Sequence, residues 1–444
     1  MKIIIAGAGD VGTHLAKMLS KENQDITLLD SDQTKLDVID SNYNLMTWNG
    51  STSSFDSLRE VGVKSADLYI AVTPYETRNL ASCAIAKKMG ARKTVARIDN
   101  SEFLKPENRK IIKELGVDNI IYPEHLAAND IAKSLSHAWT TYWGELHEGE
   151  LLLIGVKIPN KSILVNVKLK DLPVTTHDFH IAAITRKGDT IIPNGNQEIL
   201  EDDIVYFITT PPFVEEVREI CGKKNKIVKK AMIVGATRIA KRFSQLYHDK
   251  FHIRILENDM ALCERFATDL PDCEIINGDG RDIEVLRENN IYQYDAFIAL
   301  TESSETNILT CLTAKEFGVY KTIAEVENLQ FVGLADNLDI GNTINKKLLT
   351  SSRIYKILLD ADESNSKFFA MHDAEVAEIY VRPGAKITKA PVKDLKLPYG
   401  MTLAALVRDK DVMLIDGNTQ INSGDYVVVF SLMGTIEKIE KWFN

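Results

Sequence analysis

A glycine-rich run near the start of the chain stands where it could bind phosphate groups. It follows an apolar strand-like segment and opens a helical pattern, which is the context that a G-x-G-x-x-G motif needs. The first glycine allows a tight turn, the second lets the backbone approach a pyrophosphate, and the third lets strand and helix pack closely. The free N–H groups at the start of the helix would then face the phosphates. The residues of this loop are Gly7, Ala8, Gly9, Asp10, Val11 and Gly12.

An acidic residue follows the glycine motif at the spacing expected for a nucleotide site. Asp30 ends the second strand-like run, where its carboxylate could accept hydrogen bonds from both ribose hydroxyls of an adenosine. The same charge would repel a 2′-phosphate, so NAD(H) or ATP/ADP is favoured over NADP. Asp10 places a second negative charge beside the expected phosphates, so it either points outward or is neutralised by a cation or an arginine. The alternative is a tight turn capped by an aspartate, without a ligand.

Four further polar residues follow or end the next strand-like runs. Ligands of open α/β sheets bind at the carboxyl edge of the strands, so these side chains are candidate ligand contacts. Arg97 is the best candidate for a phosphate partner, although any one of the four could simply be a polar surface residue. They are Ser51, Thr52, Thr73 and Arg97.

The segments that would position these residues alternate between strand and helix patterns. Apolar β-like runs are expected at 2–6, 25–29, 45–48, 67–72, 94–98 and 119–121. Between them, Val11–Lys21 places Leu15, Met18 and Leu19 on one helical face. This alternation predicts βαβ crossovers and a doubly wound, Rossmann-like parallel sheet.

The chain repeats itself. At an offset of 228 residues, the strand-like run and turn at 2–12 align with 230–240, and Asn79 and Cys83 align with Asn307 and Cys311. At an offset of 222, Gly195-Asn196 aligns with Gly417-Asn418 in segments rich in β patterns. The order is therefore A–B–A′–B′, with α/β Rossmann-like units each followed by a small, β-rich α+β module. We expect domains at 1–142, 143–224, 228–364 and 367–444.

The second glycine loop is degraded. Gly235 remains, but Thr237 and Ala240 replace the second and third glycines, and a Cβ at position 237 would crowd a pyrophosphate. Glu257 keeps the ribose-binding acid, displaced by one position, and Asp279 stands where Ser51 stands in the first copy. Glu257 and Asp279 are therefore candidate ligands of a weaker second site, and the alternative is a structural pseudo-domain.

Composition excludes several classes of protein. The 444 residues carry 53 basic and 63 acidic side chains, a net charge of −10, which argues against nucleic-acid binding. No run of 18 apolar residues is present, so we expect a cytoplasmic protein without a membrane span. Five scattered cysteines contain no C-x-x-C pair, which argues against a disulfide framework and against a zinc ribbon, and we expect no metal site.

These motifs together resemble the RCK, or KTN, family of nucleotide-binding domains. The resemblance rests on the first glycine loop with Asp30, on Asn277-Gly278-Asp279-Gly280, on the strand end Ala71-Val72-Thr73 and on Glu305-Thr306-Asn307. The β-rich modules, with Asp394-Leu395-Lys396-Leu397-Pro398, are similar to the RCK C-terminal, or TrkA-C, domain. The chain departs from the family at Asp10, where a basic or polar residue is usual, and in its degraded second loop.

The resemblance implies a regulatory function rather than catalysis. Members of the family bind NAD(H) or ATP/ADP in the Rossmann cleft and form rings on the cytosolic face of a potassium-transporting membrane subunit, whose conduction they control. By resemblance, Gly7, Gly9, Gly12 and Asp30 are nucleotide ligands. We accordingly expect a homo-oligomer, a tetrameric ring, placed peripherally on the membrane by a TrkH-like partner.

An NAD-dependent oxidoreductase is the alternative function. It would need a general acid or base, usually His or Lys, beside the nicotinamide. The nine histidines form no motif, and Cys83 and Cys311 lie at corresponding helix positions among Ala and Leu, which is typical of core residues. We therefore expect no catalytic residues.

Overall fold

The computed structural model divides into two compact units. It describes all residues except 21–23, 41–42, 44, 173–178, 339, 360–366, 372–373, 399, 410, 433–435 and 444. The first unit comprises Met1–Ala127 together with a segment that begins at Asn345, and the second comprises Ala128–Ile344 and the C-terminal module. The expected boundary at 364 lies outside the described residues, and the four expected domain ranges stay a proposal.

The first unit is built on a six-stranded parallel sheet in the order β3-β2-β1-β4-β5-β6. This order reverses direction between β1 and β4, and in open α/β sheets ligands bind beside such a reversal. The sheet confirms the Rossmann-like expectation. Its strands are β1 (Lys2–Ala6), β2 (Asp25–Asp30), β3 (Met46–Asn49), β4 (Leu68–Ala71), β5 (Lys93–Arg97) and β6 (Asn119–Ile121).

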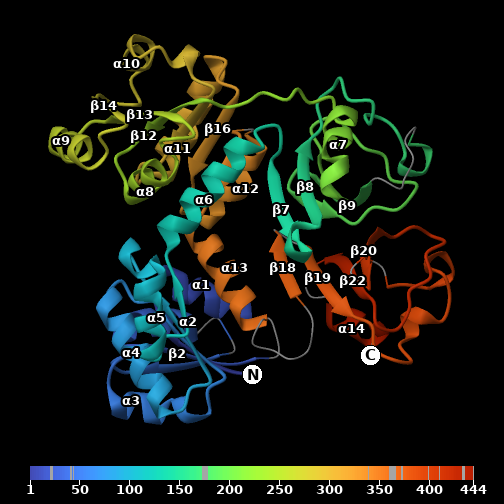
Figure 1. Ribbon diagram of the computed structural model, residues 1–444, viewed down its shortest axis with the longest axis horizontal. Helices are drawn as coiled ribbons and strands as arrows, with labels where there is room; N and C mark the ends of the chain where they lie inside the picture. The colour runs from blue at the N-terminus through green and yellow to red at the C-terminus, as the bar shows by residue number, and fades with distance from the viewer. Residues whose placement is uncertain are drawn as a thin grey trace. The chain divides into compact units, whose positions relative to one another are not determined.

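Helices connect these strands, and one further helix arrives from the other half of the chain. The connecting helices are α1 (Asp10–Leu19), α2 (Gln33–Asp40), α3 (Phe55–Glu60), α4 (Glu76–Met89) and α5 (Pro106–Glu114). Helix α6 (Pro123–Ser136) leaves the first unit, and its residues from Ala128 onward belong to the second. In return, α13 (Lys346–Leu359) packs against α1 (Figure 1). The first unit therefore contains a helix whose sequence lies more than 200 residues from its sheet.

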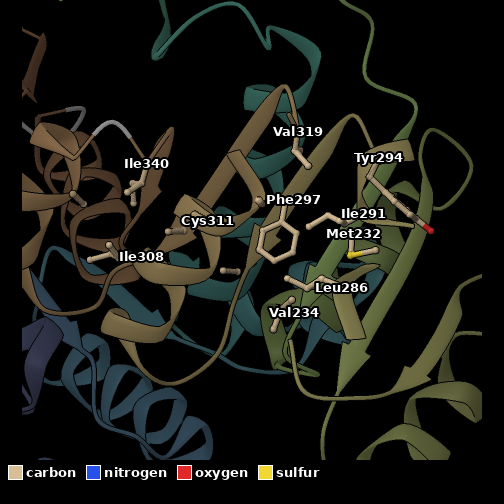
Figure 2. Close-up of a cluster of buried hydrophobic side chains, with 14 of the residues drawn as sticks. Met232, Val234, Leu286, Ile291, Tyr294, Phe297, Ile308, Cys311, Val319 and Ile340 are labelled. Carbon is tan, nitrogen blue, oxygen red and sulfur yellow. The ribbon is translucent and has the colours of Figure 1, made fainter. Parts of the chain in front are cut away.

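The second unit repeats this parallel sheet in the order β14-β13-β12-β15-β16-β17. Its strands are β12 (Lys230–Val234), β13 (His252–Glu257), β14 (Glu274–Asn277), β15 (Ala296–Ala299), β16 (Lys321–Glu325) and β17 (Asn342–Ile344). Its helices are α8 (Arg238–Tyr247), α9 (Met260–Asp269), α10 (Ile283–Glu288), α11 (Ser304–Glu316) and α12 (Leu329–Asn337). Figure 2 shows its core, in which the Phe297 ring lies among Met232, Val234 and Leu286.

Two five-stranded antiparallel sheets form the small modules, in the orders β10-β9-β11-β8-β7 and β18-β19-β22-β20-β21. The first consists of β7 (Tyr142–Leu146), β8 (Leu151–Lys157), β9 (Phe179–Arg186), β10 (Asp189–Ile191), β11 (Ile204–Thr209) and α7 (Val214–Ile220). The second consists of β18 (Lys367–Met371), β19 (Ala374–Tyr380), β20 (Met401–Arg408), β21 (Asp411–Leu414), β22 (Tyr426–Leu432) and α14 (Ile436–Phe443). The duplicated mixed α/β architecture is thereby confirmed.

The two modules share one apolar core within the second unit. Side chains such as Leu153 and Ile208 of the first module cluster with Val428 and Phe430 of the second. At the edge of this core, His180 Nε2 lies 3.1 Å from the hydroxyl of Thr402, and these two positions correspond in the 222-residue repeat. The modules thus pack through equivalent surfaces, as two copies of one fold can when they associate face to face.

Among the described residues, no helix is long and apolar enough to cross a membrane. All five cysteines are free thiols. Cys83 and Cys311 are fully buried in the two parallel-sheet domains, and burial raises the pKa of the Cys311 thiol to about 12. These two thiols are core groups, as expected. A buried, protonated thiol is a poor nucleophile.

The half-buried His180 makes the paired modules sensitive to acid. Burial lowers the pKa of His180 to about 4, whereas an unfolded histidine titrates near 6.5. At this site the unfolded chain therefore binds more protons between these values, and the contribution of His180 to the unfolding free energy falls as pH drops from about 6.5 to about 4, by up to about 3 kcal/mol. Urea unfolding measures the unfolding free energy of the wild type and of His180→Gln across this pH range. The variant should show the shallower pH dependence. Equal pH dependence in the two proteins would contradict this assignment.

Candidate functional site

The turn from β1 into α1 brings backbone groups to the carboxyl edge of the first sheet. Gly7 has φ +115°, a conformation that side-chain-bearing residues rarely adopt. A Cβ on Gly12 would collide with the Gly7 carbonyl oxygen, so that glycine is required for the close approach of helix and strand. The Gly7 N–H donates to Leu29 O at 2.8 Å, which fastens the turn to the neighbouring strand.

The carboxylate of Asp30 closes this turn. Its Oδ2 accepts a hydrogen bond from the Ala8 N–H at 2.6 Å, and its Oδ1 accepts one from the Asp32 N–H at 2.9 Å. Each carboxylate oxygen has two lone pairs, so both oxygens keep one acceptor site. Asp30 is therefore oriented at the loop and can still accept hydrogen bonds from a ribose.

Helix α1 begins without a side-chain cap. Its N-cap residue is Gly9, in an extended conformation and with no side chain to accept from the first helical N–H groups. The first N–H groups of a helix have no partner within the helix and attract anions. The loop therefore offers an anion the N-terminus of a helix that the chain itself leaves uncapped.

Asp10 is neutralised by a lysine from α13. Its carboxylate is largely exposed, and its Oδ2 lies 3.0 Å from Nζ of Lys347. The sequence left two possibilities for Asp10, an outward orientation or a neutralising cation, and the structure contains both features. Lys347 was missed by the sequence reasoning, which had no signal to bring a helix from the second half to this loop.

The other predicted ligands lie around the same edge, and some are already engaged. The Thr73 N–H and hydroxyl both contact Asn79 Oδ1, at 3.0 and 2.6 Å, and Asn79 Nδ2 donates to the carbonyls of Thr73 and Arg97. Asn79 thus ties the ends of β4 and β5 together. In the sequence, Asn79 stands out only because it is identical to Asn307 at the 228-residue offset.

Ser51 and Thr52 follow β3. The Ser51 hydroxyl lies 3.4 Å from that of Ser53. Thr52 is buried, and its hydroxyl has no hydrogen-bond partner in the described part of the chain. Hydrogen bonds link two groups of the predicted residues: Ala8 with Asp30, and Thr73 with Arg97 through Asn79. Strands β1 and β4, which precede the loop and Thr73, pair side by side in the sheet.

The second domain reproduces the turn but not its open helix end. Glu257 takes the place of Asp30, because its carboxylate accepts from Ala236 N at 2.7 Å and from Asp259 N at 2.9 Å. Thr237, however, caps α8 by accepting from the Ala240 N–H. One of the N–H groups that an anion would use is therefore already satisfied.

Charges at the second site also differ. Asp279 is held in a two-pronged ion pair by Arg281, with contacts of 2.7 to 3.1 Å, and this contact lowers the pKa of Asp279. The position that corresponds to Arg97 is Glu325, a buried acid. The second edge therefore carries an acid at the position where the first edge carries Arg97.

The described residues contain no group of three or more His, Cys, Asp or Glu side chains that could hold a metal ion. What the edge of the first sheet does offer is backbone N–H groups, a carboxylate, hydroxyls and cations. Such a set can bind a phosphorylated, ribose-containing molecule.

Two family models each match the chain twice. The TrkA-N domain matches residues 3–123 and 231–346, and the TrkA-C domain matches residues 153–222 and 376–444. These matches follow the alternation of parallel and antiparallel sheets.

Curated relatives match over almost the full length. The chain is 31% identical over 438 residues to the "Trk system potassium uptake protein TrkA" of Vibrio alginolyticus, which covers 97% of this chain and 95% of the relative. It is 30% identical over 447 residues to the TrkA homolog of Archaeoglobus fulgidus, and all of both chains is covered.

Solved structures share the fold at low identity. The GsuK RCK domain, in its crystal structure, matches with a TM-score of 0.61 at 13% identity, covering 100% of this chain and 94% of that one. The GsuK channel bound to NAD matches with a TM-score of 0.60 at 14% identity, covering 100% and 78%. With both domain types present twice and full-length relatives at 30% identity or more, the chain belongs to the family of Trk system potassium uptake proteins TrkA.

Proposed function

We propose that this protein is a regulatory subunit of a membrane potassium-uptake transporter and that it responds to an adenine nucleotide bound at the first sheet. The observation that carries the proposal is the uncapped start of α1 at Gly9 beside the oriented carboxylate of Asp30. The first supplies an anion site for a diphosphate, and the second supplies acceptors for a ribose.

The nucleotide is NAD(H) or ATP/ADP rather than NADP. The remaining acceptor sites on Asp30 suit the two hydroxyls of an adenosine ribose, whereas a 2′-phosphate would bring like charges together. Ser51, Thr52, Thr73 and Arg97 lie at or after strand ends of the same edge and complete the proposed pocket. The second domain, with Glu257 and Asp279, is the weaker site.

The names of the relatives support the potassium-uptake function, and one solved neighbour, the GsuK channel, is bound to NAD. We further propose that the chain forms a homotetrameric ring and acts from the cytosolic face on a TrkH-like membrane subunit. An NAD-dependent oxidoreductase is the alternative, and continuous oxidation of NADH by the purified protein with a small substrate would favour it.

Loss of the Asp30 carboxylate should weaken nucleotide binding at the first site. We expect Asp30→Ala to raise the Kd for NADH and for ADP about tenfold or more, because hydrogen bonds to a charged group contribute about 1.5–3 kcal/mol each. Titration calorimetry on the full chain measures these Kd values. NADPH serves as the comparison ligand, which we expect to bind the wild type more weakly than NADH.

Glu257→Ala is the matched control, because Glu257 makes the same two loop hydrogen bonds in the second domain. This variant removes the same pair of loop hydrogen bonds, but it should leave nucleotide binding at the tighter, first site unchanged. If the wild type binds neither NADH nor ADP, or if both variants bind as tightly as the wild type, the nucleotide site is not where we propose it.

The assembly and the partner can be tested together. A ring of four 49.7 kDa chains should have a mass of about 200 kDa by light scattering. Reconstituted with a TrkH-like subunit in vesicles, the wild type should make rubidium uptake depend on NADH or ADP, and Asp30→Ala should reduce that dependence. A monomer in solution, or uptake that is the same with and without the protein, would count against the proposal.

A further inference from the structure

We propose that Lys347, which the second half of the chain contributes through α13, is a phosphate ligand of the first nucleotide site. This inference rests on the proposed function, because it names a residue that the same site uses. It adds a binding group from a part of the chain that lies outside the glycine loop and outside residues 1–142. It also connects binding of nucleotide at the site to the packing of α13 against α1.

The position of the ammonium group is the first support. Lys347 Nζ lies 3.0 Å from Oδ2 of Asp10, and Asp10 is the first residue of α1, next to the N-cap Gly9. The ammonium is therefore held beside the helix N-terminus that a diphosphate would approach. A lysine at this place supplies the positive charge that the acidic loop lacks.

Unequal burial of the two partners is the second support. The Lys347 side chain is 19% exposed, whereas that of Asp10 is 74% exposed. Lys347 shares a helical face with Ser351, Ile354 and Leu358, three residues of α13 that are at most 2% exposed. The lysine is therefore fixed by packing, while the aspartate can turn into solvent. An arriving phosphate can displace the carboxylate and take over the ammonium.

The start of α13 is itself fixed. The side chain of Asn345 accepts a hydrogen bond from the Leu348 N–H at 3.0 Å and so caps the first turn, in which Lys347 lies. The second loop of the chain places a cation directly at the position of Asp10, namely Arg238. The first loop thus receives from α13 the type of charge that the second loop carries in its own sequence.

A ligand on Lys347 would couple the two halves of the chain. Asn345 alone separates α13 from β17 of the second parallel sheet. Because Lys347 lies on α13, the packing of α13 against α1 and the binding of nucleotide on Lys347 favour each other. The coupling is reciprocal by thermodynamic necessity.

Two variants that break the same ion pair should have different effects on nucleotide affinity. In calorimetric titrations of the full chain with NADH and ADP, Lys347→Met should raise the Kd at least tenfold because a phosphate contact is lost. Asp10→Asn should lower the Kd, by up to about fivefold, because a charge that repels the phosphates is removed. Lys347→Arg keeps the cation and should stay within about threefold of the wild type.

The outcomes separate this inference from the function on which it rests. If the wild type binds and Lys347→Met binds equally well, or if Lys347→Met and Asp10→Asn weaken binding alike, the pair is structural and the inference fails while the nucleotide site stands. If the wild type binds neither ligand, the proposed function and this inference fail together. Circular dichroism checks folding, and should Lys347→Met not fold, Asp10→Asn at the exposed partner still decides: weaker binding would overturn the inference.

Discussion

The hydrogen bond from the Ala8 N–H to the Asp30 carboxylate holds together the part of the fold on which the proposed activity depends. It joins the end of β2 to the turn before α1, so the helix N-terminus and the acid are fixed relative to each other. Gly7 and Gly12 make the turn possible, since a side chain at either position would be strained or would collide with the backbone. A nucleotide site at this edge needs all of these features at once.

Duplication shows which of these features belong to the fold and which belong to the first site alone. The second domain keeps the carboxylate-to-loop contact through Glu257, and it keeps the buried asparagine bridge, in which Asn307 contacts Thr301 and the Glu325 carbonyl. Both are therefore scaffold contacts. The uncapped helix end is confined to the first copy, because Thr237 caps α8. The two domains thus share a framework, while the second lacks the uncapped helix end.

Much of this was predictable from the sequence, and the exceptions have physical reasons. The parallel sheets were predictable from the glycine loop, from Asp30 and from the repeat. The tight strand–helix turn was predictable because it depends on local residue spacing alone. The shift of Glu257 by one position was also visible. The contact of Asp10 with Lys347 was not, because it joins residues more than 300 positions apart through a helix that packs on the other half's domain. The bridging role of Asn79 likewise depends on strand ends that only the folded sheet brings together.

Hydrogen–deuterium exchange with and without NADH, on the full chain, tests the central claim most directly. We predict slower exchange in peptides that cover residues 7–13 and the start of α13 at 346–351. Peptides at 235–241 should change less, since Thr237 already caps that helix. Protection at 235–241 with none at 7–13, or no protection at either loop at saturating NADH, would contradict the assignment of the first edge as the nucleotide site.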